Sequence, residues 1–199
     1  MYGVIRRYQI DPANFDEIVR RAERGLVPQL SAAPGFVSYR VLQADNGDGI
    51  SVSFFEERGQ AEEATRMVAG WVQQNLAQLM PRPPEITAGE ARVREVNQQE
   101  ELRYSVMRRY RIDANNAAEI VRRAQAGFVP LVRQLPGFAA YAMLDAGDGT
   151  LVTLSGFRDA ASADRSTQEA ANWIRDNLAQ LVPNTPEVTR ATVKLSKVR

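Results

Sequence analysis

The sequence predicts an α+β fold built from two ferredoxin-like βαββαβ repeats in tandem. A shift of 102 residues lays the second half of the 199-residue chain over the first without a gap, with Tyr2 falling on Tyr104. Roughly 40 of about 96 paired positions are identical, which is too many for chance. In each half, runs rich in β-branched and aromatic residues alternate with runs whose apolar residues recur at helical spacing, in the order βαββαβ.

This order of elements leaves one face of each antiparallel sheet without helices, so that face needs a partner. The sister repeat supplies one at high effective concentration, because it is part of the same chain. We therefore expect an intramolecular pseudo-dimer with an eight-stranded, barrel-like core. The repeats are expected at residues 1–97 and 104–199, joined by a polar linker at 98–103.

The first strand of the first repeat is predicted over residues 2–10, which are β-branched and aromatic. A helix is expected to begin near Asn14, because Glu17 follows three residues later as in a capping box. Gly25 and Pro28 predict a kink or a tightened turn midway along that helix.

The remaining elements of the repeat follow from turn signals. Pro34-Gly35 ends the first helix, and a second strand is predicted over residues 36–42. The sequence 45–49, Asp-Asn-Gly-Asp-Gly, is typical of a hairpin turn, and a third strand is predicted over 50–55. The next apolar stripe predicts a second helix from about residue 61 to 80, before a proline-rich stop and a last, polar strand near 85–96.

The composition excludes several kinds of chemistry. The chain contains neither cysteine nor histidine, which removes disulfides, thiolate nucleophiles, the imidazole base and the commonest metal and haem ligands. We therefore expect no metal and no cofactor. No run of about 20 apolar residues is present, and the first residues lack the long apolar region of a signal peptide, so we expect a cytoplasmic protein without membrane contact. The sequence contains no basic run interleaved with aromatic residues, so we do not expect a nucleic-acid partner.

Both repeats resemble the antibiotic-biosynthesis-monooxygenase superfamily, the dimeric α+β barrels. The residues that carry the resemblance are Val4-Ile5-Arg6-Arg7-Tyr8, Pro34-Gly35-Phe36, Tyr39, Leu42 and Trp71, which recur as Val106 to Tyr110, Pro136-Gly137-Phe138, Tyr141, Leu144 and Trp173. The resemblance implies an intramolecular dimeric α+β barrel. Such families include cofactor-free oxygenases of polycyclic phenols, haem-degrading oxygenases, and isomerases and decarboxylases of small rings, so the fold alone does not select an activity.

The haem-degrading branch of that family is set aside. It relies on an Asn in the first strand together with a Trp and a His. Here the first-strand position holds Arg6 or Arg7, and the chain has no His.

Eight residues are candidates for ligand binding, and no catalytic residue is assigned. They are Arg6, Tyr8, Tyr39, Trp71, Arg108, Tyr110, Tyr141 and Trp173. The tryptophans either stack on a ligand or pack in the core, and the tyrosines either hold a substrate oxygen or serve as strand formers. Each arginine of the first strand either anchors an anionic ligand or forms an internal salt bridge, for which Glu85 and Glu90 are the expected partners.

Two functions remain open. The first is a cofactor-independent monooxygenase, which binds a small aromatic or phenolic compound, stabilises its anion with Arg6 or Arg108 and lets it react directly with O₂. The alternative is a non-catalytic small-molecule-binding or structural barrel protein. A small hydrophobic or aromatic ligand is the expected partner unless the barrel is purely structural, and further association of the pseudo-dimeric chain into a homodimer stays open.

Overall fold

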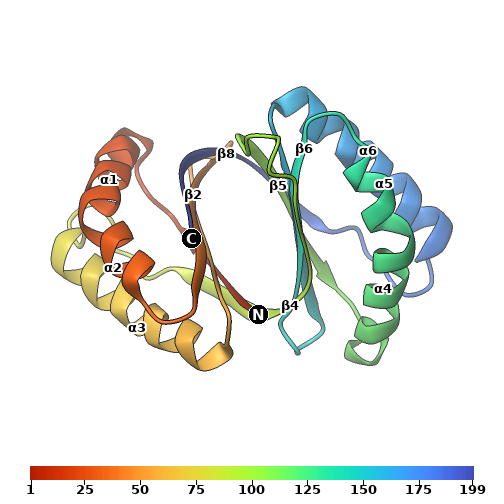
Figure 1. The fold of residues 1–199 in the computed structure, drawn as a ribbon, viewed down its shortest axis with the longest axis horizontal. Coiled ribbons are helices and arrows are strands. Elements are labelled where there is room, and N and C mark those ends of the chain that lie inside the picture. The colour runs from red at the N-terminus through yellow and green to blue at the C-terminus, as the bar shows by residue number, and fades with distance from the viewer. The chain divides into compact units, whose positions relative to one another are not determined.

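The computed structural model describes residues 1–199, in which the order βαββαβ occurs twice (Figure 1). The first repeat comprises β1 (Tyr2–Tyr8), α1 (Phe15–Arg21), α2 (Val27–Ala32), β2 (Phe36–Ala44), β3 (Gly49–Phe55), α3 (Arg58–Asn75) and β4 (Glu85–Val96). The second comprises β5 (Tyr104–Arg111), α4 (Ala117–Arg123), α5 (Val129–Arg133), β6 (Phe138–Asp145), β7 (Thr150–Phe157), α6 (Ala160–Asn177) and β8 (Glu187–Val198).

The first helical segment of each repeat is interrupted midway, where the Gly25 and Pro28 pattern predicts an irregularity, but the turn there is wide and not tightened. A π-helical turn, Ala22–Leu26, joins α1 to α2, and Pro28 stands in the first turn of α2, where a missing N–H is tolerated. Gly25 lies against Trp71 of α3, because a Cβ added at Gly25 would come within 2.8 Å of the indole ring. The glycine therefore lets the two helical segments approach closely.

The first helix begins next to Asn14 as predicted, but its capping interaction differs from the prediction, and so do both ends of the second helix. The expected cap at Asn14 is wrong: its side chain makes no capping bond, and the Asp11 carboxylate instead accepts a hydrogen bond from the Ala13 N–H at 3.0 Å. This places a short 3₁₀ turn before α1. The second helix begins at Arg58, because Glu57 and Gln60 form a reciprocal capping box, and it ends at Asn75 rather than near residue 80.

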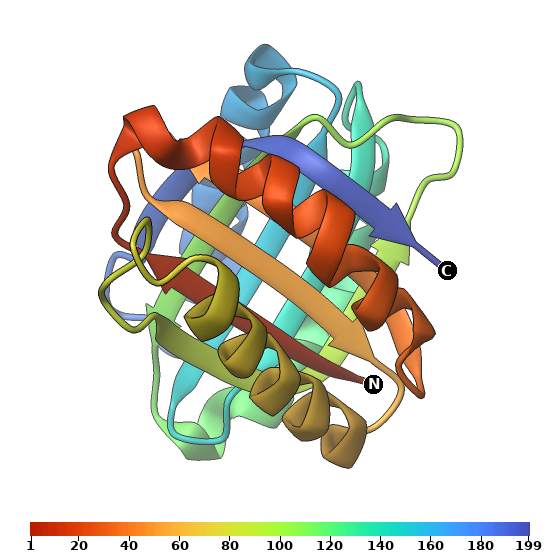
Figure 2. The same cartoon turned by 90° about the vertical axis from the view of Figure 1, so that its left-hand side faces the viewer.

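Each sheet is antiparallel and has its third strand in the middle. In the first repeat β3 pairs with both β1 and β2, and β1 also pairs with residues 85–90 of β4. In the second repeat β7 pairs with both β5 and β6 in the same manner. Figure 2 shows α1, α2 and α3 covering one face of the first repeat's strands.

The chain forms two compact units, and two strands contribute to both of them. One unit holds residues 1–90 and 192–199, and the other holds residues 91–191, so that β4 and β8 each divide between the units. Strand by strand, the order is β1-β3-β2-β8-β5-β7-β6-β4, and the sheet closes on itself. The predicted fold class, tandem βαββαβ repeats with an eight-stranded barrel, is confirmed.

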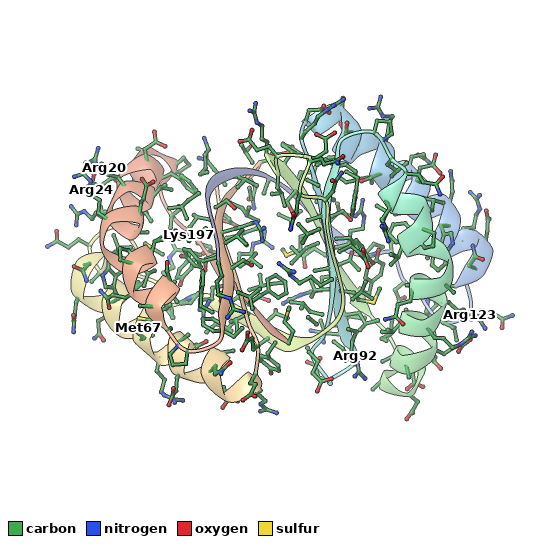
Figure 3. The ribbon with its side chains drawn as sticks, viewed as in Figure 1. Arg20, Arg24, Met67, Arg92, Arg123 and Lys197 are labelled. Carbon is green, nitrogen blue, oxygen red and sulfur yellow. The ribbon has the colours of Figure 1, made fainter.

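The core of each unit lies between its helices and its sheet. In the first, the fully buried aromatics Phe15, Phe36 and Phe55 pack with leucines of the helical segments. Figure 3 shows charged side chains on the outer side of the helices of each unit, where Arg20 and Arg24 of the first unit and Arg123 of the second point outward. None of the helices combines the length and the apolar character that a membrane span requires.

Candidate functional site

The central feature of each repeat is an arginine that lies buried beneath the long helix of that repeat, α3 or α6. Arg6 of β1 and Arg108 of β5 are 2% and 3% exposed. Side chains alternate between the two faces of a strand, so Tyr8 and Tyr110, two residues further on, share the face of their arginine. The neighbouring Arg7 points the other way and pairs with Asp48 at 2.7 Å.

Both buried arginines are held by hydroxyl groups. Arg6 donates to Ser53 Oγ of β3 at 3.1 Å and to Thr65 Oγ1 of α3 at 2.7 Å. The second repeat reproduces this arrangement: Arg108 donates to Ser155 Oγ at 3.2 Å and to Thr167 Oγ1 at 2.9 Å. The hydroxyls fix the direction of each guanidinium but carry no charge.

For Arg6 and Arg108, the internal salt bridge that the sequence left as an alternative is absent, although the neighbouring Arg7 forms one with Asp48. Neither Arg6 nor Arg108 contacts a carboxylate, and the expected partners of Arg6, Glu85 and Glu90, are solvent-exposed. A buried cation without an anion loses several kcal/mol of hydration that neutral hydrogen bonds only partly replace. Each repeat therefore keeps a charged group that an anionic ligand would stabilise.

The tyrosines around each arginine remain protonated. Burial raises the pKa of Tyr8 and of Tyr39, and the Arg6 charge opposes the rise. Tyr110 and Tyr141 follow the same pattern around Arg108. Burial in turn lowers the pKa of both guanidiniums, although arginine stays charged at any physiological pH. The site therefore offers neutral phenol donors beside a fixed positive charge.

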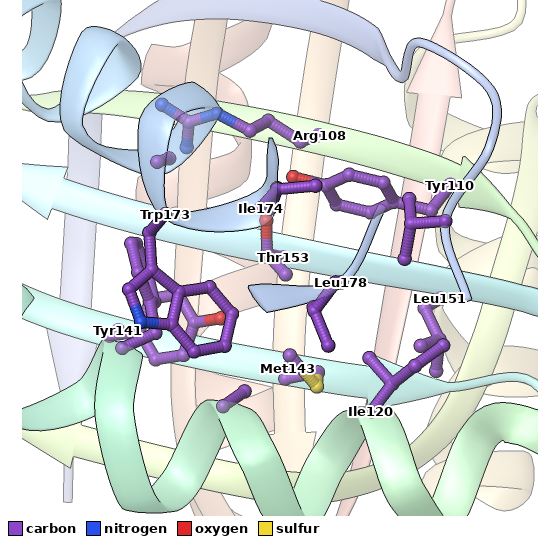
Figure 4. Close-up of a pocket in the computed structure, with 14 residues that line it drawn as sticks. Arg108, Tyr110, Ile120, Tyr141, Met143, Leu151, Thr153, Trp173, Ile174 and Leu178 are labelled. Carbon is purple, nitrogen blue, oxygen red and sulfur yellow. The ribbon is translucent and has the colours of Figure 1, made fainter. Parts of the chain in front are cut away.

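The second repeat brings all four of its predicted residues together. Arg108, Tyr110, Tyr141 and Trp173 line one inner cavity of about 30 Å³, which is room for a water molecule or two. Figure 4 shows these side chains reaching the cavity from the sheet and from α6, with apolar residues such as Ile120 and Leu178 completing its wall.

The first repeat has a comparable inner cavity and, beside it, a much larger opening. The inner cavity measures about 40 Å³ and is lined by Tyr8 and Tyr39. The second opening, which we call the outer cleft, measures about 520 Å³ and is lined by Arg6, Tyr8 and Thr65. Its remaining wall comes from α3 and from the segment that follows it, including Val68, Val72, Gln73, Met80, Pro81, Arg82, Pro83, Pro84 and Ile86.

Trp71 lines neither opening of the first repeat. It packs against Gly25 in the core, whereas its counterpart Trp173 packs against Gly127 and also borders the inner cavity. Thr65 and Thr167, which orient the arginines, were not among the predicted site residues. Both repeats keep this threonine, and that identity was the available signal.

No group of three or more His, Cys, Asp or Glu side chains is placed to hold a metal ion. The polar groups that converge on the site are a guanidinium, hydroxyls and phenols. This donor set suits the oxygen atoms of an organic anion, because guanidinium forms its strongest hydrogen bonds to carboxylates, phosphates and similar groups.

Comparison with known proteins agrees with this fold. The family model described as antibiotic biosynthesis monooxygenase matches residues 1–67, within the first repeat. The predicted resemblance to this family is confirmed. No curated protein matches the chain in sequence.

Solved structures similar to the chain share its fold at low sequence identity. A candidate monooxygenase from Lactobacillus acidophilus is 11% identical with a TM-score of 0.78, covering 99% of this chain and 95% of that chain. An anthrone oxidase-like protein is 12% identical with a TM-score of 0.66, covering 99% and 92%. A heme-degrading enzyme from Listeria monocytogenes is 8% identical with a TM-score of 0.56, covering 96% and 99%. At these identities the likeness establishes the fold of this chain and neither its activity nor its substrate.

Proposed function

We propose that the first repeat binds a small aromatic compound with an acidic oxygen and oxidises it with O₂ without a metal or organic cofactor. The observation that carries the proposal is Arg6, a buried cation without an anionic partner that opens onto a cleft of about 520 Å³. The apolar cleft wall suits an aromatic body, and the guanidinium suits a phenolate or enolate oxygen.

The residues present are suited to an oxidation in which the substrate supplies the electrons. For an anthrone, loss of a proton to water gives an enolate, whose oxygen Arg6 stabilises with its charge and Tyr8 with a hydrogen bond. The ring carbon then bonds to O₂ to give a peroxide anion, which takes back a proton from water. Loss of water from the resulting hydroperoxide forms the ketone. One oxygen atom enters the product and the other leaves as water with the two hydrogens of the original CH₂. The protein supplies orientation and electrostatic stabilisation.

The test measures oxygen consumption by chelator-treated protein, with anthrone and with dihydroxynaphthalene as substrates. Formation of the quinone product is measured in parallel by its absorbance. Replacing Arg6→Met should lower kcat/KM at least 100-fold, because the buried charge that stabilises the anion is lost. Arg7→Met is the matched control, because Arg7 lies on the same strand but faces away and pairs with Asp48. Oxygen uptake that is unchanged in the Arg6 variant would contradict the proposal.

The second candidate function is ligand binding without chemistry. It is favoured by the size of the inner cavities, about 30 and 40 Å³, which leave no room for a ring beside the tyrosines deepest in each repeat. Stoichiometric binding of an aromatic anion with no oxygen uptake across a panel of phenols and anthrones would select this alternative.

A further inference from the structure

Among the positions at which the two repeats differ, one on the last strand lies close to the buried arginine. Ala88 of β4 stands opposite Val4 of β1, next to the pair formed by Ile86 and Arg6. Directly opposite residues in an antiparallel pair share a face, so position 88 faces the helices. The equivalent residue of the second repeat, 102 positions later, is Arg190 of β8.

In the second repeat this arginine ties the last strand to the long helix. Arg190 Nε donates to Asp164 Oδ1 of α6 at 3.1 Å, one helical turn before Thr167. Its charge is also close enough to Arg108 to lower the pKa of that guanidinium, in addition to the larger effect of burial. The ion pair therefore spans the gap between β8 and α6 on the side where Arg108 meets Thr167.

The first repeat has no such tie at the same place. Ala88 carries no side chain long enough to reach α3, and Glu62, the equivalent of Asp164, pairs with Arg58 of its own helix at 2.8 Å. The gap between α3 and the last strand is where the outer cleft lies, since Thr65 and Ile86 both line it. In the second repeat, the inner cavity that Arg108 lines measures about 30 Å³.

The charges that line the outer cleft define the class of ligand. Its only charged lining residues are Arg6 and Arg82, and no acidic residue contributes. Arg82 lies in the proline-rich turn and donates to Gln9 Oε1, whereas the equivalent residue of the second repeat is Asn184. The cleft therefore presents one buried and one exposed cation across an apolar wall.

We infer that the chain has a single ligand site, in the first repeat, for a flat organic anion, and that the Arg190–Asp164 ion pair closes the equivalent site of the second repeat. The inference rests on the proposed function, since it takes the outer cleft as the binding site. It adds the stoichiometry, the requirement for a second acidic group near Arg82, and the residues that make the repeats unequal.

The experiment is calorimetric titration of the full chain with a hydroxynaphthoate, which carries a phenol and a carboxylate on one bicyclic ring. Wild type should bind one molecule per chain. Arg6→Met should weaken binding at least 100-fold and Arg108→Met less than threefold. Arg82→Asn should weaken the hydroxynaphthoate at least fivefold and leave the affinity for naphthol within twofold.

The ion pair is tested by reciprocal exchange between the repeats. The double variant Arg190→Ala and Asp164→Ala should bind two hydroxynaphthoate molecules per chain. Binding of the second molecule should be lost when Arg108→Met is added. Ala88→Arg with Glu62→Asp should weaken binding to the first repeat at least tenfold. The side chains of Arg190 and Asp164 are 40% and 61% exposed, so the variant that replaces both with alanine should fold. The control is the double variant Arg133→Ala and Glu95→Ala, which removes another helix–strand ion pair.

The outcomes separate this inference from the proposed function. Two molecules bound to wild type, or one that depends on Arg108, overturns the single site in the first repeat. A stoichiometry of one in the Arg190 and Asp164 double variant overturns the role of the ion pair. One molecule bound with no oxygen uptake supports the inference while removing the catalytic proposal, and no binding to wild type overturns both.

Discussion

The two repeats share the buried core of their site and differ at its rim. The arginine, its serine and threonine partners and two tyrosines occupy matching positions in both, with hydrogen bonds that agree within 0.2 Å. The residues that we infer to control access to the arginine differ between the repeats. Ala88 of the first repeat is replaced by Arg190 in the second, and Arg82 by Asn184. Duplication thus preserved the polar group that is costly to bury, while the openings around it diverged.

The comparison is tested most strongly by removing each buried charge. Arg6→Met and Arg108→Met should each raise the free energy of unfolding by about 1–4 kcal/mol, because an apolar chain replaces a buried cation that has no anion. Both values come from urea unfolding of the full chain. A loss of stability in either variant would show that the arginine is a structural group rather than one kept for a ligand at the expense of stability.

A second prediction concerns the glycines that face the tryptophans. Gly25→Ala should lower the free energy of unfolding by about 1–3 kcal/mol, because its Cβ would lie 2.8 Å from the ring of Trp71, which borders neither cavity and has no room to move. Gly127→Ala should change it by less than about 1 kcal/mol. There the contact is 3.1 Å, Trp173 can shift toward its cavity, and alanine favours the helix.

The control for this pair is Gly70→Ala, at an open position of α3 where a Cβ meets nothing within 4 Å. It should gain up to about 1 kcal/mol from helix propensity alone. Equal losses at Gly25 and Gly127 would mean that the two tryptophans are held alike, and the proposed difference between the repeats in internal space would be wrong.

Repetition and periodicity were enough to predict the architecture. The 102-residue shift and the two Pro-Gly pairs predicted the order of elements. The glycine and proline in the first helical segment predicted an interruption before α2, although as a kink or a tightened turn and not as the wide turn that is present. The cap was missed because Asp11 precedes a proline and closes a 3₁₀ turn, so the nearer Asn14 fitted the helical pattern better. The end of the long helix was predicted too late. The residues from Leu76 to Met80 form turns, but they bury apolar side chains in the core with the spacing that a helix would give.

The site was predictable only in part. The arginines and tyrosines lie on one strand face, which strand periodicity predicts. Their partners Thr65 and Thr167 lie on helices 59 residues further along, and the sequence does not show which helical turn meets which strand residue. Access depends on whether the residue at position 88 or 190 can reach the helix across a gap, and only the folded chain defines that distance.

The smallest predicted effect concerns a feature that the repeats share fully. Asp11→Ala and Asp113→Ala should each lower the free energy of unfolding by about 1 kcal/mol, the usual value for losing a helix cap. The two caps accept hydrogen bonds of 3.0 and 2.9 Å from equivalent amides, so equal losses are expected. Asn14→Ala and Asn116→Ala, whose side chains do not cap, should cost less than about 0.5 kcal/mol. Unequal losses at the two aspartates would extend the divergence of the repeats from the rim of the site to the start of the first helix.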